Sequence, residues 1–520
     1  MGKKIDNIKV AIDEDLEEKL KLLAPNYAHY RILKKSVDAR TKQKLHWVYS
    51  LEIFEENEEP ATLFEVPPSI ESQERPLVIG SGPAGLFAAL RLAERGVPCD
   101  VFERGSESGQ RILAINKYWR YGKLNPEDNV CFGEGGAGLY SDGKLITRIK
   151  SPHIPYVMGR LVDFGAPEEV AFLANPHIGS NKIRRLIPKL RARLLELGCR
   201  VHFNTKVEEL LMEKNQVVGL KTKDGQTFRS PYVILATGHS AEDMFHHLQD
   251  LGVQMEGKSF AMGLRVEHPQ GWVNRTQYRE FSEHPELGAA NYKLTYHNHR
   301  EDVGVYSFCM CPGGYVLSSG TEADGVVSNG MSNFHRNSPY ANAAIVVTVD
   351  HEKLFGQDLM GGLKMRRQLE QRAFQMVQEK KEGHKLPAQS LIDFLIAKET
   401  KHTLKGSSPS GLSSVRLDQL FDEKIYLHLC EAFERFQNKM EGFISPEATL
   451  YGVESRTSCP VRISRDKDSL ESSSHKGLFP CGEGAGFAGG ITSAACDGVR
   501  VADSIVAQLS SCNTVANTSH

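Results

Sequence analysis

The spacing of apolar residues in the first 70 positions predicts a small α+β module. The stretch IDNIKVAID alternates apolar and polar residues, EDLEEKLKLLA has helical spacing, and YRILKKSVDA and KLHWVYSLEIF are strand-like again. Alternation is typical of a half-buried strand, and a three-to-four-residue period is typical of an amphipathic helix. We therefore expect a β-α-β-β unit over residues 1–70. The acidic, proline-bearing stretch EENEEPATLFEVPPSIESQERP that follows predicts a linker.

A different pattern begins at Pro76. A strand PLVIG, a long helical run and a second strand CDVFE open a β-α-β unit of a doubly wound parallel sheet. Three more strand-like runs, VHFNTKVEELLME, VVGLKTKDG and TFRSPYVILATG, extend it. Later positions mix strand and helical patterns, among them the charged helical run GLKMRRQLEQRAFQMVQEKKEG. We expect an α/β fold with a discontinuous Rossmann-like domain over 76–248 and 451–510 and an inserted α+β substrate domain over 249–450.

The composition is that of a globular protein with more than one domain. Hydrophobic residues make up 40% of the 520 positions, and 63 Lys and Arg balance 65 Asp and Glu. This near-neutral charge predicts neither a nucleic-acid partner nor an anionic membrane. The N-terminus lacks the apolar core of a signal peptide, and no apolar run approaches the roughly 20 residues of a membrane span. Ten cysteines are scattered without C-x-x-C spacing, so we expect a cytoplasmic protein with reduced thiols.

The segment VIGSGPAGLFAALRLAERGVPCDVFERG carries the most specific motif. Gly80, Gly82 and Gly85 form G-x-G-x-x-G directly after a strand and before a helix. The first glycine allows the tight turn, the second lets backbone amides approach a pyrophosphate, and the third permits close helix-to-strand packing. Glu103 ends the next strand, where a carboxylate can accept hydrogen bonds from the hydroxyls of an adenosine ribose. The motif predicts a dinucleotide site, and a glycine turn without nucleotide is the less favoured alternative.

A second segment, NVCFGEGGAGLYSDGKLITR, also satisfies G-x-G-x-x-G, through Gly133, Gly135 and Gly138. No strand and helix frame it, because Asp142 and Gly143 interrupt the segment where a crossover helix would run. A second Rossmann domain is therefore not expected. A glycine-dense loop can instead present backbone N–H groups to a planar or anionic ligand. We expect this loop to contact the bound cofactor, and a mobile surface turn is the alternative.

The C-terminal segment GLFPCGEGAGFAGGITSAACDGVRVADSIVAQL predicts a strand followed by a glycine-rich loop and a final helix. An acidic turn stands at Gly482 and Glu483, and the helix begins near Gly490 and Ile491. The N-terminus of a helix attracts negative charge, so this end of the helix is a candidate cofactor contact. A helix start with a small-residue packing face is the alternative.

These three motifs, together with ILATGHS at 234–240, resemble in order and spacing those of the glutathione-reductase-like superfamily of FAD enzymes. The resemblance implies that the first motif binds the ADP half of FAD and that the C-terminal motif contacts its ribityl and flavin parts, with Glu483 in place of the commoner Asp. The final helix would then favour the negatively charged reduced flavin. The expected cofactor-binding residues are Gly80, Gly82, Pro83, Ala84, Gly85, Glu103, Arg104, Gly136, Ala137, Gly138, Val207, Ala236, Thr237, Gly238, Gly482, Glu483, Gly490 and Ile491.

More narrowly, the chain resembles a family of uncharacterised bacterial FAD-dependent dehydrogenases with a small N-terminal α/β module. The resemblance extends over KKSVDAR, FGEGGAGLYSDGKL, FAMGLRVEHPQ, CPGGYV and ESRTSCPVRI. This family implies the cofactor but no settled substrate. Our candidates for catalysis at the open face of the flavin are Arg265, Glu267, Glu454 and Arg456, because arginines there would suit an anionic substrate. A structural ion pair between Glu454 and Arg456 is the alternative.

Cysteines and histidines give weaker indications. Cys309 and Cys311 would share one face of an extended strand, so a redox disulfide or a soft-metal contact is an alternative that we weigh. The disulfide reductases of the superfamily place their pair near the first helix, and no such pair exists between residues 106 and 150. The histidines lack the spacing of metal ligands, and we expect no metal at His177, His239, His268 or His335.

The favoured reaction is that of a dehydrogenase or reductase that passes a hydride through flavin N5 to or from a small substrate. Related hydroxylases usually show A-D-G where this chain has Ala236-Thr237-Gly238, which disfavours a flavin monooxygenase. A flavin-holding RNA-modification or scaffold protein is a further alternative, disfavoured by the near-neutral charge. Without a second Rossmann unit, transient NAD(P)H binding and reduction by the substrate itself both stay open. The oligomeric state and a protein partner for the N-terminal module stay open too.

Overall fold

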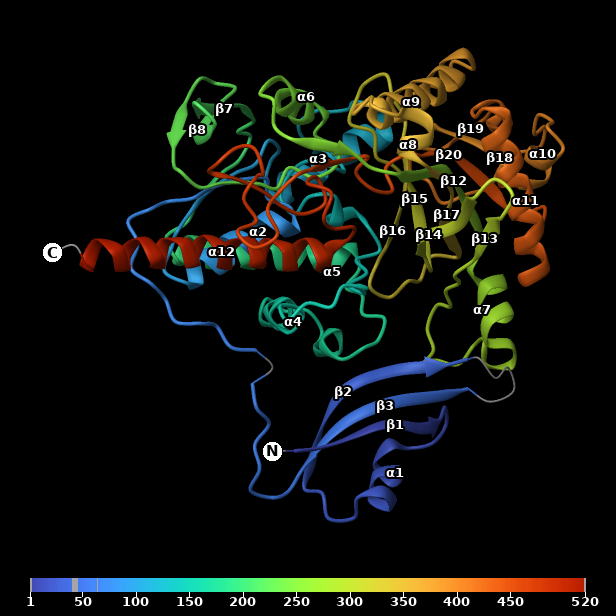
Figure 1. The fold of residues 1–520 in the computed structure, drawn as a ribbon. Coiled ribbons are helices and arrows are strands. Elements are labelled where there is room, and N and C mark those ends of the chain that lie inside the picture. The colour runs from blue at the N-terminus through green and yellow to red at the C-terminus, as the bar shows by residue number, and fades with distance from the viewer. Residues whose placement is uncertain (1, 40–44, 63, 519–520) are drawn as a thin grey trace.

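The N-terminal module has the β-α-β-β order that its sequence predicts. In the computed structural model, which describes residues 2–39, 45–62 and 64–518, strand β3 lies between β1 and β2 in an antiparallel sheet. Figure 1 shows the module set apart from the rest of the chain. Its elements are β1 Lys3–Ala11, α1 Leu16–Leu23, β2 His29–Asp38 and β3 His46–Phe54.

The module contacts the main body at one strand edge. The Lys35 amide on β2 donates a hydrogen bond to the Phe172 carbonyl, and the Ala174 amide donates one to the Lys35 carbonyl. The module's core also packs against Phe281 and Leu287. These contacts tie the module to two separate parts of the main body.

The dinucleotide-binding unit is a five-stranded parallel sheet in the order β22-β10-β4-β5-β6. Its strands are three residues long; β4 and β10 are wholly apolar, and β4, β10 and β22 are fully buried, as expected of parallel strands covered on both faces. The last strand comes from the C-terminal part of the chain, so the sheet is assembled from two distant segments, as the sequence predicts. The strands are β4 Leu77–Ile79, β5 Asp100–Phe102, β6 Arg200–His202, β10 Val233–Leu235 and β22 Leu478–Pro480.

Helices cover this sheet, and α2 and α12 lie side by side in the same layer (Figure 1). A smaller antiparallel sheet in the order β7-β8-β9 follows β6. The helices are α2 Pro83–Glu94, α3 Ser108–Tyr121, α4 Ile154–Asp163, α5 Ser180–Glu196, α6 Glu242–Asp250 and α12 Ile491–Thr518; the small-sheet strands are β7 Val207–Glu213, β8 Gln216–Thr222 and β9 Thr227–Arg229.

The inserted part is built around a seven-stranded sheet in the order β13-β14-β17-β12-β20-β18-β19. Strand β20 runs past position 450, where the sequence analysis ended the inserted domain. The strands are β12 Phe260–Pro269, β13 Thr295–Asn298, β14 Val303–Cys311, β17 Tyr340–Val349, β18 Leu386–Ser390, β19 Leu412–Ser414 and β20 Thr449–Glu454; the helices are α7 Gln270–Tyr278, α8 His351–Phe355, α9 Gly361–Glu379, α10 Leu391–Leu395 and α11 Glu423–Lys439.

Two strand pairs complete the fold. The hairpin β15 Gly314–Ser318 and β16 Ser328–Ser332 packs on the large sheet, and β11 Met255–Gly257 pairs with β21 Val461–Ile463 where the chain enters and leaves the inserted part. Among the residues that the structure describes, no helix combines the length and the apolar character needed to cross a membrane.

The contact between α2 and α12 depends on a glycine, which gives a first prediction. A Cβ on Gly498 of α12 would lie 2.1 Å from the Ala84 carbonyl oxygen and 3.0 Å from the Ala88 amide nitrogen. Gly498→Ala should therefore lower the free energy of unfolding by about 1 to 3 kcal/mol, the usual cost of overpacking, measured by urea denaturation followed by circular dichroism. Gly109→Ala is the matched control, because a Cβ there meets nothing within 4 Å. Equal stability of the two variants would contradict the prediction.

Candidate functional site

A cavity of about 1280 Å³ lies between the parallel sheet and the seven-stranded sheet. One side is lined by the ends of β4, β5 and β10 and by the loops that follow them; the other is lined by β13, β14, β16 and the end of β20. Ligands of open parallel sheets bind outside the carboxyl ends of the strands. The cavity therefore stands where a dinucleotide is expected, and it continues beyond that position.

The first glycine turn is shaped by close backbone contacts. A Cβ on Gly80 would lie 2.4 Å from the Ala236 carbonyl oxygen, and one on Gly85 would lie 1.9 Å from the Gly80 carbonyl oxygen. Gly82 differs, because a Cβ there would meet only the Gly136 Cα, at 3.8 Å. Gly82 is the N-cap residue of α2 and has no side chain that could accept a hydrogen bond from the first-turn amides. The first-turn amides are thus available to an anion at the cavity, as in pyrophosphate-binding turns.

The second glycine segment lies against the first. It contains a short 3-10 turn, Ala137–Tyr140, and no strand or α-helix. A Cβ on Gly136 would lie 3.0 Å from the Gly82 Cα, and one on Gly138 would lie 3.0 Å from Ile491 and 3.7 Å from Pro83. The segments that carry the three motifs therefore meet at a single point of the cavity wall.

A buried arginine that the sequence analysis missed fixes this second segment. Arg111 of α3 is fully buried and donates hydrogen bonds of 2.7 to 3.2 Å to the carbonyls of Asn129, Val130, Gly133, Glu134 and Gly136. Burial lowers the pKa of Arg111 from its ordinary value. The loop is thus clamped in place, which argues against the alternative of a mobile surface turn.

Glu103 lies on the cavity wall, as expected, and is already extensively hydrogen-bonded. It accepts bonds from the Ser81 amide at 3.0 Å and hydroxyl at 2.7 Å, and from the amides of Gly105 at 3.0 Å and Gly133 at 2.9 Å. The carboxylate therefore joins the two glycine segments. Contact between Glu103 and a ribose stays a prediction.

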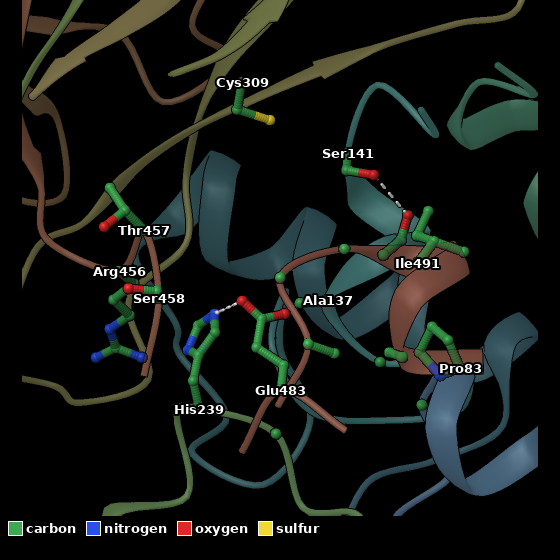
Figure 2. Close-up of a pocket in the computed structure, with 18 of the residues that line it drawn as sticks. Pro83, Ala137, Ser141, His239, Cys309, Arg456, Thr457, Ser458, Glu483 and Ile491 are labelled. Atoms are coloured by element: carbon green, nitrogen blue, oxygen red, sulfur yellow. Dashed lines mark hydrogen bonds and ion pairs between the residues drawn. The ribbon is translucent and has the colours of Figure 1, made fainter. Parts of the chain in front are cut away.

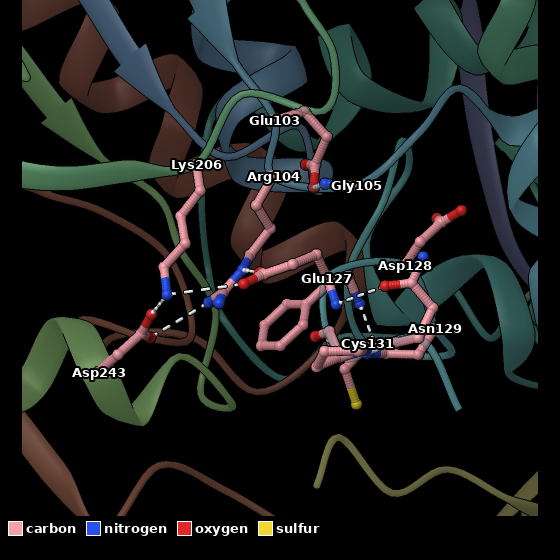
Figure 3. A network of polar contacts seen from close by, with 12 residues as sticks. Glu103, Arg104, Gly105, Glu127, Asp128, Asn129, Cys131, Lys206 and Asp243 are labelled. Atoms are coloured by element: carbon pink, nitrogen blue, oxygen red, sulfur yellow. Dashed lines mark hydrogen bonds and ion pairs between the residues drawn. The ribbon is translucent and has the colours of Figure 1, made fainter. Parts of the chain in front are cut away.

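Arg104 belongs to an ion-pair network at the same end of the cavity (Figure 3). It pairs with Glu127 and, at 3.1 Å, with Asp243, and its guanidinium lies 4.2 Å from the centre of the Phe132 ring. Lys206 joins the network through Asp243 at 2.6 Å. The network links the loop after β5 to α6 and leaves Arg104 with its charge compensated.

Glu483 and His239 occupy the wall opposite Cys309. Figure 2 shows Glu483 projecting between His239 and Ala137, and its carboxylate lies 4.0 Å from His239 Nε2. Burial raises the pKa of Glu483 to about 7 and lowers that of His239 to about 3. At neutral pH His239 is therefore uncharged, whereas Glu483 exchanges a proton readily. No role was assigned to His239 from the sequence.

The four candidate catalytic residues separate into two groups. Glu454 and Arg456 line the cavity, whereas Arg265 and Glu267 are not among the described residues that do so. Both lie on β12, a strand buried along almost its whole length. Glu267 bonds Ser407 and Tyr451, and burial raises its pKa to about 7. The expectation that Arg265 and Glu267 face the open side of the flavin is corrected, because the wall of the cavity covers them.

The ion pairs also differ from the expected one. Glu454 pairs with Arg265 through two contacts of 3.0 Å, and Arg456 pairs with Glu370 of α9 through contacts of 2.9 and 2.7 Å. Burial alone would lower the pKa of each arginine, but the partner carboxylate raises it above its ordinary value. Glu454 and Arg456 therefore do not form a pair with each other, and both of their charges are compensated.

Most of the expected cofactor contacts line the cavity. Gly85 and Gly482 do not line it: Gly85 packs on Gly80, and the Gly482 amide donates to Asp497 at 2.8 Å. Lys144, Arg148 and Lys293 line the cavity without having been singled out from the sequence. The expected residues along the wall are Gly80, Gly82, Pro83, Ala84, Glu103, Arg104, Gly136, Ala137, Gly138, Val207, Ala236, Thr237, Gly238, Glu483, Gly490 and Ile491.

Two of the other histidines that were considered as ligands bond to the backbone. His177 Nε2 lies 2.9 Å from the Phe334 carbonyl, and His268 Nε2 lies 2.8 Å from the Phe443 carbonyl. Within the described part of the chain, no three His, Cys, Asp or Glu side chains are grouped so that they could hold a metal ion.

Comparison with known families identifies three regions. Residues 78–119 match an NAD(P)-binding Rossmann-like domain, residues 171–335 match the FAD dependent oxidoreductase family, and residues 259–457 match the family described as FAD-dependent protein, C-terminal domain-like. The first region holds the glycine motif, of which Gly80 and Gly82 line the cavity.

Two relatives and one solved structure are similar to this chain. An uncharacterised protein of Clostridium beijerinckii is 38% identical over 97% of this chain and 99% of its own length. Thiamine thiazole synthase of Aeropyrum pernix is 27% identical over 32% of this chain and 54% of its own length. The solved structure of glycine oxidase from Bacillus cereus has 13% identity and a TM-score of 0.31, over 84% of this chain and 95% of its own. The chain therefore belongs, with the Clostridium protein, to a family of FAD-dependent oxidoreductases that contain an NAD(P)-binding Rossmann-like domain.

Proposed function

We propose that the protein is a dehydrogenase or reductase that exchanges a hydride between its FAD and a small, anionic molecule. The observation that carries this proposal is that one continuous cavity is lined both by the glycine turns and by β13 and β14 of the other sheet. Its volume of about 1280 Å³ exceeds the roughly 300 to 1,000 Å³ of a typical ligand pocket. When bound, FAD would supply N5 as the hydride acceptor or donor.

The charges along the wall support an anionic substrate. Lys144, Arg148 and Lys293 line the cavity, and the Lys144 ammonium donates to the Met310 carbonyl rather than to a carboxylate. Arg336 also lines it, but its guanidinium is neutralised by Asp142. Lys258 lines the cavity as well and donates to the Gly486 carbonyl at 3.3 Å, so four lysine and arginine charges are available to attract an anion into the cavity.

The groups near Glu483 support hydride exchange rather than oxygen activation. A hydride transfer needs little acid-base machinery, and Glu483 and His239 supply one readily titrating group and one neutral imidazole. The segment Ala236-Thr237-Gly238 lines the cavity without the A-D-G pattern usual in related hydroxylases. The electron donor is NADH or NADPH bound transiently in the cavity, or the substrate itself. Neither requires a nucleic acid or a membrane partner, and reduced thiols suit a cytoplasmic enzyme.

The first test of this proposal is anaerobic mixing of the holoprotein with NADH, with NADPH and with a panel of small organic anions. We expect one of these donors to bleach the flavin absorbance in the absence of oxygen, because a dehydrogenase needs no oxygen for this step. Stopped-flow absorbance measures the rate. Reduction by NADPH followed by oxygen-dependent hydroxylation of an added compound would identify a monooxygenase instead.

A second prediction separates cofactor binding from folding. A Cβ on Gly82 meets only the Gly136 Cα at an ordinary distance of 3.8 Å, so Gly82→Ala should fold normally. The methyl group would nevertheless occupy the place where backbone amides approach the pyrophosphate. We expect FAD binding to weaken by about tenfold or more, equal to about 1.4 kcal/mol, measured by fluorescence titration of the apoprotein. Gly109→Ala should bind as the parent does, and unchanged binding by Gly82→Ala would contradict the assignment.

A third prediction concerns pH. Glu483 is neutral below pH 7 and negative above it, because its pKa is raised to about 7. Its negative charge would disfavour the anionic reduced flavin, so the midpoint potential of the parent should fall more steeply above pH 7 than that of Glu483→Gln. We expect a difference of about 30 mV, a tenfold change for a two-electron couple, measured by equilibration with redox dyes. Glu379→Gln, on an exposed part of α9, is the control; parallel pH profiles of Glu483→Gln and the parent would refute the role.

A further inference from the structure

Two cysteines meet at the wall of the cavity on β14. Cys309 lines the cavity and Cys311 is fully buried behind it. The pairing of β14 with β17 shifts register between Phe308 and Cys311, and Cys309 has a φ of 44°. An extended strand would place the two side chains on one face at ordinary spacing, whereas this bulge turns Cys309 toward the cavity. Figure 2 shows the Cys309 thiol pointing into the cavity, across from Glu483.

The Cys311 side chain is hydrogen-bonded to the backbone of Cys309. The Cys311 thiol lies 3.3 Å from the Cys309 carbonyl oxygen, to which it donates. The neighbouring Cys311 thiol and the positive charges of Arg265 and Lys144 lower the pKa of Cys309 to about 7. The same pairing raises the pKa of Cys311 well above its usual value. Cys309, which borders the cavity, thus ionises more readily than Cys311, which is buried beside it.

We propose that Cys309 and Cys311 form a redox-active pair that carries two electrons between the flavin and an anionic disulfide substrate. This inference rests on the proposed function, and it names the substrate class of the same cavity. The cationic side chains of Lys144, Arg148 and Lys293 line that cavity, so a disulfide that bears carboxylates fits its charge better than a neutral or cationic one.

The exchange balances in three steps. A Cys309–Cys311 disulfide takes up two electrons and two protons from the reduced flavin, which leaves two thiols and oxidised FAD. The Cys309 thiolate then attacks one sulfur of the substrate, breaking its S–S bond, forming a mixed disulfide and releasing one half as a thiol. Finally the Cys311 thiolate attacks the Cys309 sulfur, which releases the second thiol and restores the disulfide. The two protons taken up at the start leave on the two product thiols.

The number of electrons that the air-oxidised holoprotein takes up tests whether Cys309 and Cys311 form a redox-active pair. Anaerobic dithionite titration should consume about four electrons per FAD in the parent, two for the flavin and two for the disulfide, and about two in Cys309→Ser. Cys199→Ser is the matched control, because Cys199 belongs to the other close cysteine pair, 3.6 Å from Cys99 and away from the cavity. It should still consume about four. Uptake of two electrons by the parent, or a loss in Cys199→Ser rather than in Cys309→Ser, overturns the proposal.

A trapping experiment then identifies the two roles. Cys311→Ser, reduced and mixed with the anionic disulfide 5,5′-dithiobis(2-nitrobenzoate), should hold one thionitrobenzoate on Cys309, seen by peptide mass spectrometry. Reoxidation of the reduced parent should be at least tenfold faster by the anionic aliphatic disulfide dithiodiglycolate than by the cationic aliphatic disulfide cystamine, whose leaving thiol is the more acidic of the two. Cys311→Ala replaces Cys311→Ser if the serine variant loses FAD. A label on another cysteine, or equal rates with both disulfides, refutes the assignment. Flavin bleaching by a donor in the same preparations separates this outcome from failure of the proposed dehydrogenase.

Discussion

Two buried charged side chains hold the cavity wall together. Arg111 gathers five backbone carbonyls of the second glycine segment, and Glu103 joins that segment to the first turn through four hydrogen bonds. Burying a charge costs several kcal/mol unless it is fully hydrogen-bonded, and here the backbone supplies the bonds. Because a trans peptide points its N–H away from its carbonyl, the bond from Arg111 to the Gly136 carbonyl turns the Ala137 amide away from Arg111. Ala137 lines the cavity, so the clamp fixes the backbone beside a residue of the cavity wall.

The net charge that the cavity presents to a ligand depends on which of its charged side chains are paired with an opposite charge. The cavity-facing Glu454 and Arg456 are each neutralised from outside the cavity, by Arg265 and by Glu370. Charged side chains paired in this way add little net field. The lysines and arginine that lack such partners therefore decide which ligands the cavity attracts. A count of charged residues near the motifs would have given a different result.

The sequence was sufficient for the features that depend on local chemistry. The glycine turn before α2, the helix that begins at Ile491 and the β-α-β-β order of the module all follow from spacing over a few residues. Contacts between residues far apart in the sequence could not be predicted from such spacing. Strand β12 is buried on both faces, so its pattern does not tell whether the face that carries Arg265 and Glu267 borders a ligand. The partner of Arg456 lies 86 positions away on α9, and no local pattern indicates it.

The buried ion pair between Arg265 and Glu454 also positions the Arg265 guanidinium for two further hydrogen bonds. Besides its two contacts with Glu454, the guanidinium donates to Asn342 at 2.9 Å and to the Cys309 carbonyl at 3.3 Å. A salt bridge in the interior is weak evidence for stability, since desolvation offsets most of its attraction. Here the ion pair holds the Arg265 guanidinium, a hydrogen-bond donor, next to Cys309, the one residue of β14 whose backbone adopts a positive φ. Arg265 is thus a positioning residue, because it holds the bulge that brings the Cys309 thiol to the cavity.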